Sequence, residues 1–281
     1  MIKDTFLAMG TTIEVIAESN DQVNETQALF GRYEARFSRF DGRSELTSIN
    51  NDRSPSLEIS PTMAEVLELA KKLERLTGGV FDPSMGSSVI AWGYDRTFEE
   101  MTAPIASPQI HPQDSWSIDG KQLHRPPGVS LDLGGLVKGW AADQAVETGL
   151  AKVVSAGGDI RSALPDSEVE IDDGVAGPGI VISLGTGGLA TSSTMKRRWM
   201  VGARSAHHIV DPRTLAPADT PVLSATVTCR TAAEAEAAAK TLVILGVDGL
   251  AWADRQDWIT AAMVTWHDGS VFATSGWELA A

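Results

Sequence analysis

The segment from 131 to 143 constrains what this chain can fold into more than any other. It reads Leu-Asp-Leu-Gly-Gly-Leu-Val-Lys-Gly-Trp-Ala-Ala-Asp, so an acidic residue ends a strand, two glycines open a turn, and a helix begins with a lysine in its first turns. Glycine lets the backbone approach a ligand closely, and the start of a helix presents free N–H groups to an anion. The segment indicates a phosphate site, and an ordinary strand-to-helix connection with a surface lysine explains it equally well.

Helical and strand patterns follow one another along the chain without regular alternation. Apolar residues at helical spacing predict four helices, over 21–37, from 61 to the glycines at 78 and 79, over about 136–149 and over about 231–245. Strand patterns lie within 5–17 and at 152–156, 179–184, 198–202, 207–210, 222–229, 259–266 and 270–274. A hairpin is expected near 116–123, inside a proline-rich surface excursion over 102–128. This order predicts an α+β fold of mixed sheets with packed helices.

The overall charge limits the possible partners. The 281 residues include 37 acidic and 23 basic side chains, which gives a net charge of -14. Such a chain is a poor candidate for sequence-independent binding to nucleic acid or to an anionic membrane. There is no apolar run of membrane-spanning length and no signal-peptide pattern at the N-terminus, so the sequence as given predicts a cytoplasmic protein.

The numbers and positions of cysteine and histidine limit the disulfides, metal sites and catalytic bases that the chain can form. The single cysteine, Cys229, excludes an intramolecular disulfide and a cysteine-based metal site, and is expected to be a small buried residue. None of the five histidines forms a HExxH pair, which argues against a zinc hydrolase. His208, in a strand pattern that ends at Asp211, is a candidate general base, and a hydrogen-bonded structural histidine is the alternative.

Several polar segments give weaker signals. The turns at 157–159 and 185–188 are rich in glycine, and each is expected to be a tight turn. The basic triplet at 196–198 either attracts phosphate or forms a solvated loop. The carboxylate of Asp82, before Pro83, either binds a ligand N–H or caps the next segment.

Short motifs recur in a fixed order from one end of the chain to the other. They are Met9-Gly10-Thr11-Thr12; Phe37-Ser38-Arg39-Phe40 with Ser44-Glu45-Leu46 and Asn50; Gly79-Val80-Phe81-Asp82-Pro83 with Trp92-Gly93; Asp132-Leu133-Gly134-Gly135 with Lys138-Gly139-Trp140 and Asp143; Ala156-Gly157-Gly158-Asp159; Ala190-Thr191-Ser192; His208-Ile209-Val210-Asp211-Pro212-Arg213-Thr214; and Leu245-Gly246. In this order they resemble the FAD:protein FMN transferases, also called ApbE-like flavin transferases. The resemblance implies a single domain over 1–281, with a T-fold-like α+β architecture that holds FAD between two subdomains.

The resemblance also implies an activity and a set of site residues. FMN would pass from FAD to a threonine hydroxyl of a partner flavoprotein, with Mg²⁺ as cofactor and AMP as the leaving group. This agrees with the general requirements of phosphoryl transfer, which are a positioned pyrophosphate, cations that neutralise its charge and a deprotonated hydroxyl. His208 would be the base, and the Gly135 carbonyl would be a metal ligand. By position, the flavin site would be lined by Met9, Phe40, Val80, Phe81, Asp82, Asp132, Lys138 and Ile209.

The chain departs from the family pattern most clearly at the metal site. The family's Asp-x-x-x-Thr pair before Leu-Gly reads here as Glu236 and Lys240. Glutamate can bind Mg²⁺ through a carboxylate oxygen, but a charged lysine has no lone pair to offer. Its ammonium would instead take the metal's place and neutralise the pyrophosphate directly. The alternative is a plain Glu–Lys contact on a helix surface, worth roughly 0.2–0.5 kcal/mol.

Two further departures are single substitutions. Phe40 stands where the family commonly has tyrosine, so ring stacking survives and a hydroxyl is lost. Leu215 stands where glycine usually follows Arg-Thr.

These features leave three classes of function. The first is a flavin transferase with a weakened or replaced Mg²⁺ site. The second is a diverged FAD-binding protein of the same fold, or an FAD pyrophosphatase in which water replaces threonine. Retention of His208 with Asp132 favours an enzyme over a carrier. A structural protein, the third class, needs only a core and would not need this series of polar turn motifs.

Overall fold

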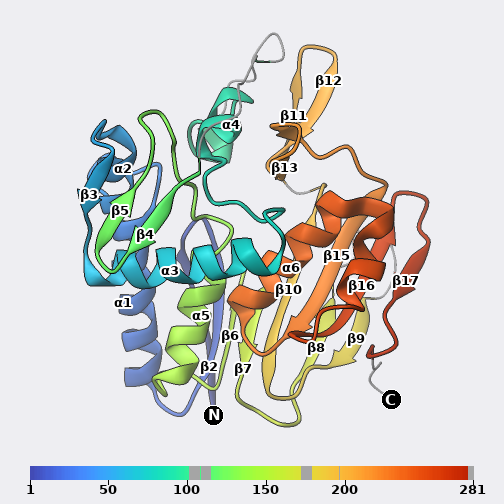
Figure 1. The fold of residues 1–281 in the computed structure, drawn as a ribbon. Helices are drawn as coiled ribbons and strands as arrows, with labels where there is room; N and C mark the ends of the chain where they lie inside the picture. Colours follow the sequence, from blue (N-terminus) through green and yellow to red (C-terminus); the bar gives the residue numbers. More distant parts are fainter. Residues whose placement is uncertain (101–107, 109–114, 172–178, 196, 278–281) are drawn as a thin grey trace. The chain divides into compact units, whose positions relative to one another are not determined.

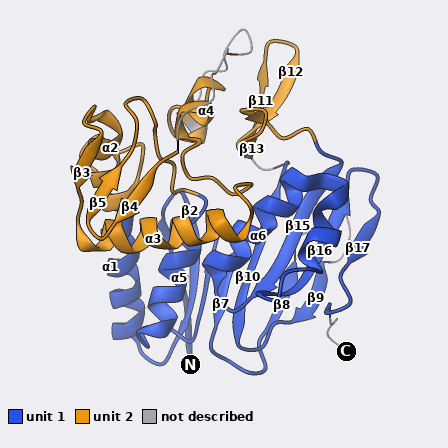
Figure 2. Ribbon diagram, in the orientation of Figure 1, with its two compact units in different colours: residues 1–34, 135–195, 220–281 blue, residues 35–134, 196–219 orange. Residues whose placement is uncertain are grey.

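The structure is a computed structural model, and it describes residues 1–100, 108, 115–171, 179–195 and 197–277. The chain forms two compact units, which Figure 2 shows in different colours. Unit 1 consists of residues 1–34, 135–195 and 220–281, and unit 2 of residues 35–134 and 196–219. Unit 2 therefore corresponds to two insertions in the sequence of unit 1.

Unit 1 is built around an eight-stranded sheet with the order β1-β2-β6-β7-β10-β15-β16-β17 (Figure 1), in which each neighbouring pair is antiparallel. Its strands are β1 (Ile2–Ala8), β2 (Thr11–Ala17), β6 (Val153–Ala156), β7 (Asp159–Ser162), β10 (Gly187–Ser193), β15 (Val222–Cys229), β16 (Ile259–Trp266) and β17 (Val271–Ala273). Strand β2 buries every second side chain, as expected where one face of a sheet is covered, whereas β15 is buried along its whole length.

Helices cover this sheet in unit 1. Helix α5 (Val137–Glu147) packs on β6 and β7, and the alanine-rich α6 (Ala232–Leu245) packs on β10 and β15. The small side chains of α6 let it approach the sheet closely, and nearly all of its residues are buried. The remaining elements are α1 (Asn20–Phe37), which begins in unit 1 and ends in unit 2, the strand pair β8 (Glu168–Ile171) and β9 (Ile180–Ser183), η2 (Gly246–Asp248) and α7 (Gly249–Ala253).

Unit 2 combines a long helix and several short helices with small sheets. Its elements are α2 (Glu45–Asn51), β3 (Ser56–Glu58), α3 (Pro61–Leu76), α4 (Gly86–Ala91), η1 (Phe98–Glu100), β4 (Ser117–Asp119), β5 (Gln122–His124), β11 (Arg198–Val201), β12 (Arg204–His207), β13 (Val210–Asp211) and β14 (Ala216–Pro217). Helix α3 begins where its sequence dictates, because the Ser60 hydroxyl accepts a hydrogen bond from the Met63 amide and Pro61 occupies the first helical turn.

The mixed order of strands and helices confirms the predicted α+β class. The four predicted helices correspond to α1, α3, α5 and α6 within two residues at most of their ends. The predicted hairpin is β4 with β5, and Cys229 is buried in β15 as expected. The tight turn at 157–159 is also confirmed, since Gly157 and Gly158 have positive φ between β6 and β7. Most of the segment 102–114 lies outside the described residues, as does Lys196 of the basic triplet.

One predicted turn and one predicted strand were wrong in part. The turn expected over 185–188 is in part strand, because β10 already begins at Gly187 and pairs with β7 and β15. The strand expected over 207–210 is interrupted at His208 and Ile209. There the chain changes partners, since β12 pairs with β11 and β13 pairs with β14.

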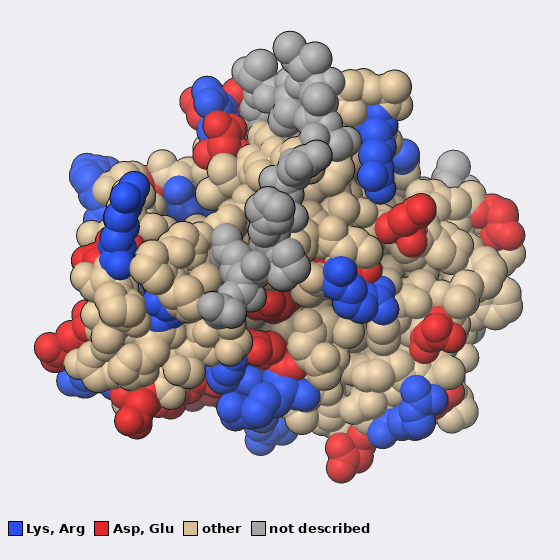
Figure 3. Space-filling view, turned by 45° about the horizontal axis from the view of Figure 1, so that its top comes forward, with Lys and Arg blue, Asp and Glu red and all other residues tan. Residues whose placement is uncertain are grey.

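The surface carries both signs of charge. On the face drawn in Figure 3, basic side chains occur as separate groups with acidic ones interspersed among them. Among the described residues, none of the helices combines the length and the apolar character needed to cross a bilayer.

Gly188 lies in β10, where this strand packs closely against the start of α6. A Cβ atom at this residue would lie 2.1 Å from the carbonyl carbon of Thr231 and 2.2 Å from the amide nitrogen of Ala232. Both are backbone atoms, so neither can move aside as a flexible side chain would. The close approach of helix and strand, and not a turn, therefore requires glycine here.

We expect Gly188→Ala to lower the free energy of unfolding by about 1–3 kcal/mol, the usual cost of overpacking. Gly31→Ala is the matched control, because Gly31 lies exposed in α1 and a Cβ atom there would meet nothing within 4 Å beyond its own stretch of helix. This control should raise the free energy of unfolding by about 0.5–1 kcal/mol, since alanine favours helix. Urea unfolding of the parent and of the two variants measures both changes in the free energy of unfolding. Equal stability of the Gly188 variant and the parent would contradict the packing argument.

Leu215 adopts a backbone conformation that leucine rarely takes. Its φ is +57°, in the turn between β13 and β14. The turn is held on both sides, because the Leu215 amide donates to the Asp211 carbonyl at 2.8 Å and the Leu215 carbonyl accepts from Trp92 Nε1 at 2.8 Å. Leucine thus adopts here the left-handed conformation that glycine takes at little cost.

We expect the Leu215→Gly variant to be more stable than the Leu215→Ala variant by about 1 kcal/mol. Both substitutions remove the same packing beyond Cβ, and only glycine adopts the left-handed conformation at little cost. Thermal unfolding of the pair measures the difference. An alanine variant at least as stable as the glycine variant would show that the turn does not hold the left-handed conformation.

Candidate active site

The turn singled out in the sequence joins unit 2 to unit 1. Gly134 is the last residue of unit 2 and Gly135 the first of this part of unit 1, and α5 starts two residues later with Lys138 in its first turn. The strand expected to end at Asp132 is reduced to a single bridge between Ser130 and Met85. Pairing stops there because the partner segment turns into α4 at Gly86.

Four charged side chains of unit 1 form one network. Lys138 Nζ lies 2.9 Å from Asp159 Oδ2 and 3.9 Å from Glu236 Oε1. The same Glu236 Oε1 pairs with Lys240 Nζ, and Glu236 Oε2 accepts a hydrogen bond from Ser192 Oγ at 3.2 Å. Helices α5 and α6 and strands β7 and β10 each contribute to the network, so the packing of helices on the sheet brings its members together.

The network is largely shielded from water. The side chains of Asp159 and Glu236 are 3% and 6% exposed, and those of Lys138 and Lys240 are 14% and 16% exposed. Burial, followed by the nearby charge of Glu236, raises the pKa of the Asp159 carboxyl above its usual value, and Lys138 opposes this rise. The Glu236–Lys240 pair is therefore not the solvated helix-surface contact offered as the alternative interpretation.

Lys240 lies against the backbone of Gly135. Its Nζ donates a hydrogen bond to the Gly135 carbonyl oxygen at 3.4 Å. A Cβ atom at Gly135 would lie 2.4 Å from that Nζ, so the lysine occupies the space that a side chain there would need. Glycine at 135 thus makes room for the ammonium group of Lys240.

These residues do not fit a divalent metal ion. Magnesium needs a set of oxygen ligands, and the resemblance assigns it to the Gly135 carbonyl and to the side chains at 236 and 240. Here the Gly135 oxygen and one Glu236 oxygen both accept hydrogen bonds from Lys240, which has no lone pair to offer. Throughout the described part of the chain, no three acidic, histidine or cysteine side chains gather where they could hold a metal.

Asp143 fixes the position of α6 relative to α5. Its carboxylate accepts hydrogen bonds from the Ala232 amide at 2.8 Å and from the Ala233 amide at 3.0 Å, the first two of α6. Arg161 Nε lies 3.4 Å from the same carboxylate. The sequence motif contains Asp143, but its role was missed, because nothing in the local pattern indicates that an acid in one helix caps another.

The unit 2 candidates Phe40 and Asp132 meet at Arg39. Arg39 Nε lies 3.1 Å from Asp132 Oδ2, and the guanidinium carbon lies 4.2 Å from the centre of the Phe40 ring and 4.5 Å from that of Tyr94. Arg39 also donates to the Tyr94 carbonyl oxygen at 2.6 Å. Arginine is well suited to this double task of pairing with a carboxylate and stacking on rings. Its role was missed, although the Phe-Ser-Arg-Phe motif contains it.

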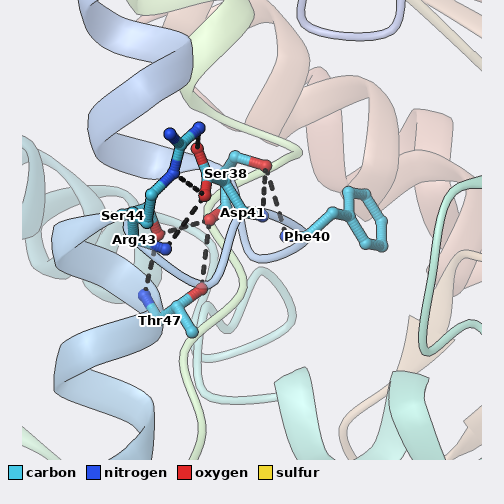
Figure 4. A network of polar contacts seen from close by, with 6 residues as sticks. All are labelled: Ser38, Phe40, Asp41, Arg43, Ser44 and Thr47. Carbon is cyan, nitrogen blue, oxygen red and sulfur yellow. Dashed lines mark hydrogen bonds and ion pairs between the residues drawn. The ribbon is translucent and has the colours of Figure 1, made fainter.

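The loop that carries Phe40 is held by its own polar residues (Figure 4). Ser38 Oγ accepts hydrogen bonds from the amides of Phe40 and Asp41, each at 3.2 Å. The Ser38 carbonyl accepts from the hydroxyls of Ser44 and Thr47, at 2.5 Å and 3.3 Å. Figure 4 shows the Phe40 ring pointing away from this polar network, and the residue is 40% exposed. The loop thus presents an aromatic face on a fixed backbone.

Among the other unit 2 candidates, Asp82 caps its own turn. Asp82 Oδ1 accepts from the Ser84 amide and hydroxyl at 2.8 Å and 2.7 Å, which is the capping role offered as one of its two alternatives. Phe81 and Ile209 are buried, and Val80 is half-buried. His208 is half-buried and lies between β12 and β13.

Met9 is the remaining candidate of unit 1. It lies in the two-residue turn between β1 and β2, where it and Gly10 both have positive φ, at 53° and 68°. This geometry suits the right-handed twist of a hairpin. The Met9 side chain packs half-buried against the core of unit 1.

The burial of Asp143 generates a pH prediction. Burial raises the pKa of its carboxyl to about 7, although the two α6 amides and Arg161 favour the charged form. The folded protein therefore holds this proton more tightly than the unfolded chain does. The resulting stabilisation is present below about pH 4, near the ordinary value of 3.8, and is lost as the pH rises to about 7.

We expect Asp143→Asn to flatten the fall in the free energy of unfolding between about pH 4 and pH 7. Urea unfolding at several pH values measures this slope. Asp119→Asn, a change at an exposed aspartate of β4, is the control and should leave the slope as in the parent. Parallel curves for the parent and the Asp143 variant would exclude Asp143 as its source.

The comparisons with known proteins agree with one another. A sequence profile described as the ApbE family matches residues 9–264. An FAD:protein FMN transferase of Rhodobacter capsulatus is 30% identical over 303 residues, which cover 97% of this chain and 57% of the relative, so the chain spans little more than half of that protein. One of Treponema pallidum is 26% identical over 272 residues, covering 83% of this chain and 73% of the relative.

Solved structures show the same fold. The ApbE protein of Thermotoga maritima superposes with a TM-score of 0.86 at 23% identity, over 98% of this chain and 97% of the other. The flavin transferase ApbE of Vibrio cholerae superposes with a TM-score of 0.79 at 24% identity, with the same coverage. Since the profile matches most of the sequence and includes residues of both units, the chain belongs to the ApbE family.

Proposed function

We propose that residues 1–281 act as one FAD:protein FMN transferase domain. The observation that carries the proposal is the pair of lysines, Lys138 and Lys240, which share the Glu236 carboxylate beside the Gly134-Gly135 turn. Two ammonium groups at a glycine turn before a helix suit a pyrophosphate, and FAD contains one. The names of the relatives from Rhodobacter capsulatus and Treponema pallidum support the same activity.

The reaction would be a phosphoryl transfer to a threonine hydroxyl of a partner flavoprotein. The threonine oxygen forms a bond to the phosphorus on the FMN side of the pyrophosphate, and the bond from that phosphorus to the bridging oxygen breaks. AMP leaves with the bridging oxygen, and the hydroxyl proton passes to His208. The chain's own contribution is to hold the pyrophosphate, to neutralise its charge and to accept the hydroxyl proton at His208.

The flavin ring has a suitable platform in unit 2. Phe40 is partly exposed, its loop is fixed by Ser38, and Arg39 stacks on its ring from one side. An isoalloxazine is a flat aromatic system, and such rings stack favourably on phenylalanine. On the same proposal we assign Met9, Val80, Phe81, Asp82, Asp132 and Ile209 to flavin binding.

A second candidate function follows from Lys240. If a lysine in place of the metal ion favours water over threonine as the nucleophile, the protein hydrolyses FAD to FMN and AMP. If neither nucleophile reacts, the protein binds FAD without changing it. Product analysis separates these outcomes, because transfer leaves FMN bound covalently to a protein and hydrolysis leaves it free.

We further propose that the protein acts in the cytoplasm, on an acceptor flavoprotein, without nucleic-acid or membrane partners.

We expect His208→Ala to lower the rate of FMN transfer by about 10²–10⁴-fold, the usual contribution of a general base, while FAD still binds. Transfer is followed as covalent flavin fluorescence of a threonine-containing acceptor flavoprotein on a denaturing gel, and AMP by chromatography. His124→Ala, at an exposed histidine of β5, is the matched control and should keep full activity. Unchanged turnover in the His208 variant would remove this residue from the mechanism.

A further inference from the structure

Lys240 occupies a position that is built for a cation. Two acceptors converge on its Nζ, the Gly135 carbonyl at 3.4 Å and Glu236 Oε1. An ammonium carries three N–H donors, and these two acceptors use two of them. The side chain is 16% exposed, so the group is shielded from bulk water without being sealed off from a ligand.

The surroundings keep this lysine in place. Glu236 is held from its other oxygen by Ser192 Oγ at 3.2 Å, so the carboxylate cannot rotate without losing a hydrogen bond. Helix α6 is buried on nearly all sides, which fixes the backbone of both Glu236 and Lys240. The missing side chain at Gly135 leaves the space that the end of the lysine fills.

The charges of the network argue against a metal ion as a further member. Lys138 and Lys240 balance Asp159 and Glu236, so the four side chains together are formally neutral. The carboxylates that could bind a divalent cation are already paired with ammonium groups, so an entering metal ion would have to displace a lysine from Asp159 or Glu236. The two ammonium groups are the members of the network that attract an anion.

We infer that the Lys240 ammonium serves as a tethered cation in place of a divalent metal ion, and that it binds the FAD pyrophosphate together with Lys138. The inference rests on the proposed function in so far as FAD is the ligand. Its consequence is that this protein binds FAD, and acts on it, equally well with and without Mg²⁺.

The test compares the parent protein with three variants. In Lys240→Thr the ammonium is removed, and in the double variant Glu236→Asp/Lys240→Thr an oxygen pair that can hold Mg²⁺ is restored. Lys71→Thr is the control, because Lys71 also pairs with a glutamate in its own helix at low exposure, in unit 2. Mg²⁺ alone is titrated calorimetrically into each protein, and FAD affinity is measured by flavin fluorescence in EDTA and in Mg²⁺. Circular dichroism verifies that each variant is folded.

We expect the parent to show no Mg²⁺ binding and the same FAD affinity, within twofold, in EDTA and in Mg²⁺. Lys240→Thr should lose at least tenfold in FAD affinity in EDTA, and the double variant should bind Mg²⁺ and regain affinity with it. The control should behave as the parent. Binding of Mg²⁺ by the parent, or a tenfold loss of its FAD affinity in EDTA, would overturn the inference.

Measurements on the parent alone decide the matter if the variants do not fold. The outcomes also separate this inference from the proposed activity. FAD binding that ignores EDTA, without FMN transfer to any acceptor, supports the tethered cation and contradicts the transferase. Transfer that stops in EDTA supports the transferase and contradicts the tethered cation.

Discussion

The hydrogen bonds from the first amides of α6 to the Asp143 carboxylate are the constraint on which the candidate site depends. They tie α6 to α5, and Gly139 lets the two helices come close, because a Cβ there would lie 2.9 Å from the Ala232 carbonyl carbon. Lys138 is on one of these helices, and Glu236 and Lys240 are on the other. Without this link, nothing local would bring the lysine of α5 within reach of the glutamate of α6.

The two units pair buried or half-buried carboxylates with different kinds of cation. Unit 1 gathers two lysines and two carboxylates, and each lysine carries a compact charge without the planar geometry of arginine. Unit 2 uses one arginine, which pairs with Asp132 through its edge and stacks on Phe40 and Tyr94 through its face. A point charge suits a phosphate group, whereas a planar cation suits the support of an aromatic surface. The family's tyrosine hydroxyl is missing at Phe40, yet the ring keeps its support.

The sequence predicted what periodicity and local turn chemistry control. Helices α3 and α6 were predicted from their apolar patterns, and the structure adds a Ser60 cap and a Thr231 cap at their starts. The hairpin glycines at 157 and 158 have positive φ, as a tight turn requires. Predictions from the sequence failed where contacts with distant segments determine the local structure. The sequence predicted a turn at Gly187 and Gly188, but both lie in β10, and the packing of α6 on this strand requires glycine at 188. The strand predicted over 207–210 is interrupted because its two halves pair with different strands. The buried pairing of Lys240 with Gly135 depends on tertiary packing that no local pattern reveals.

The insertion of unit 2 into the sequence of unit 1 has a consequence for synthesis. Strand β2 pairs with β6, so this edge of the growing sheet stays open until residues 18–152 have been translated. At ribosomal rates of 5–20 residues per second that interval is roughly 7–30 s. During it, the hairpin of β1 and β2 exposes an unpaired backbone edge, which is a template for wrong pairing with other chains. Until β6 is synthesised, the nascent chain is thus exposed to wrong pairing at β2, and a chaperone that binds the β1–β2 hairpin would protect it over this interval.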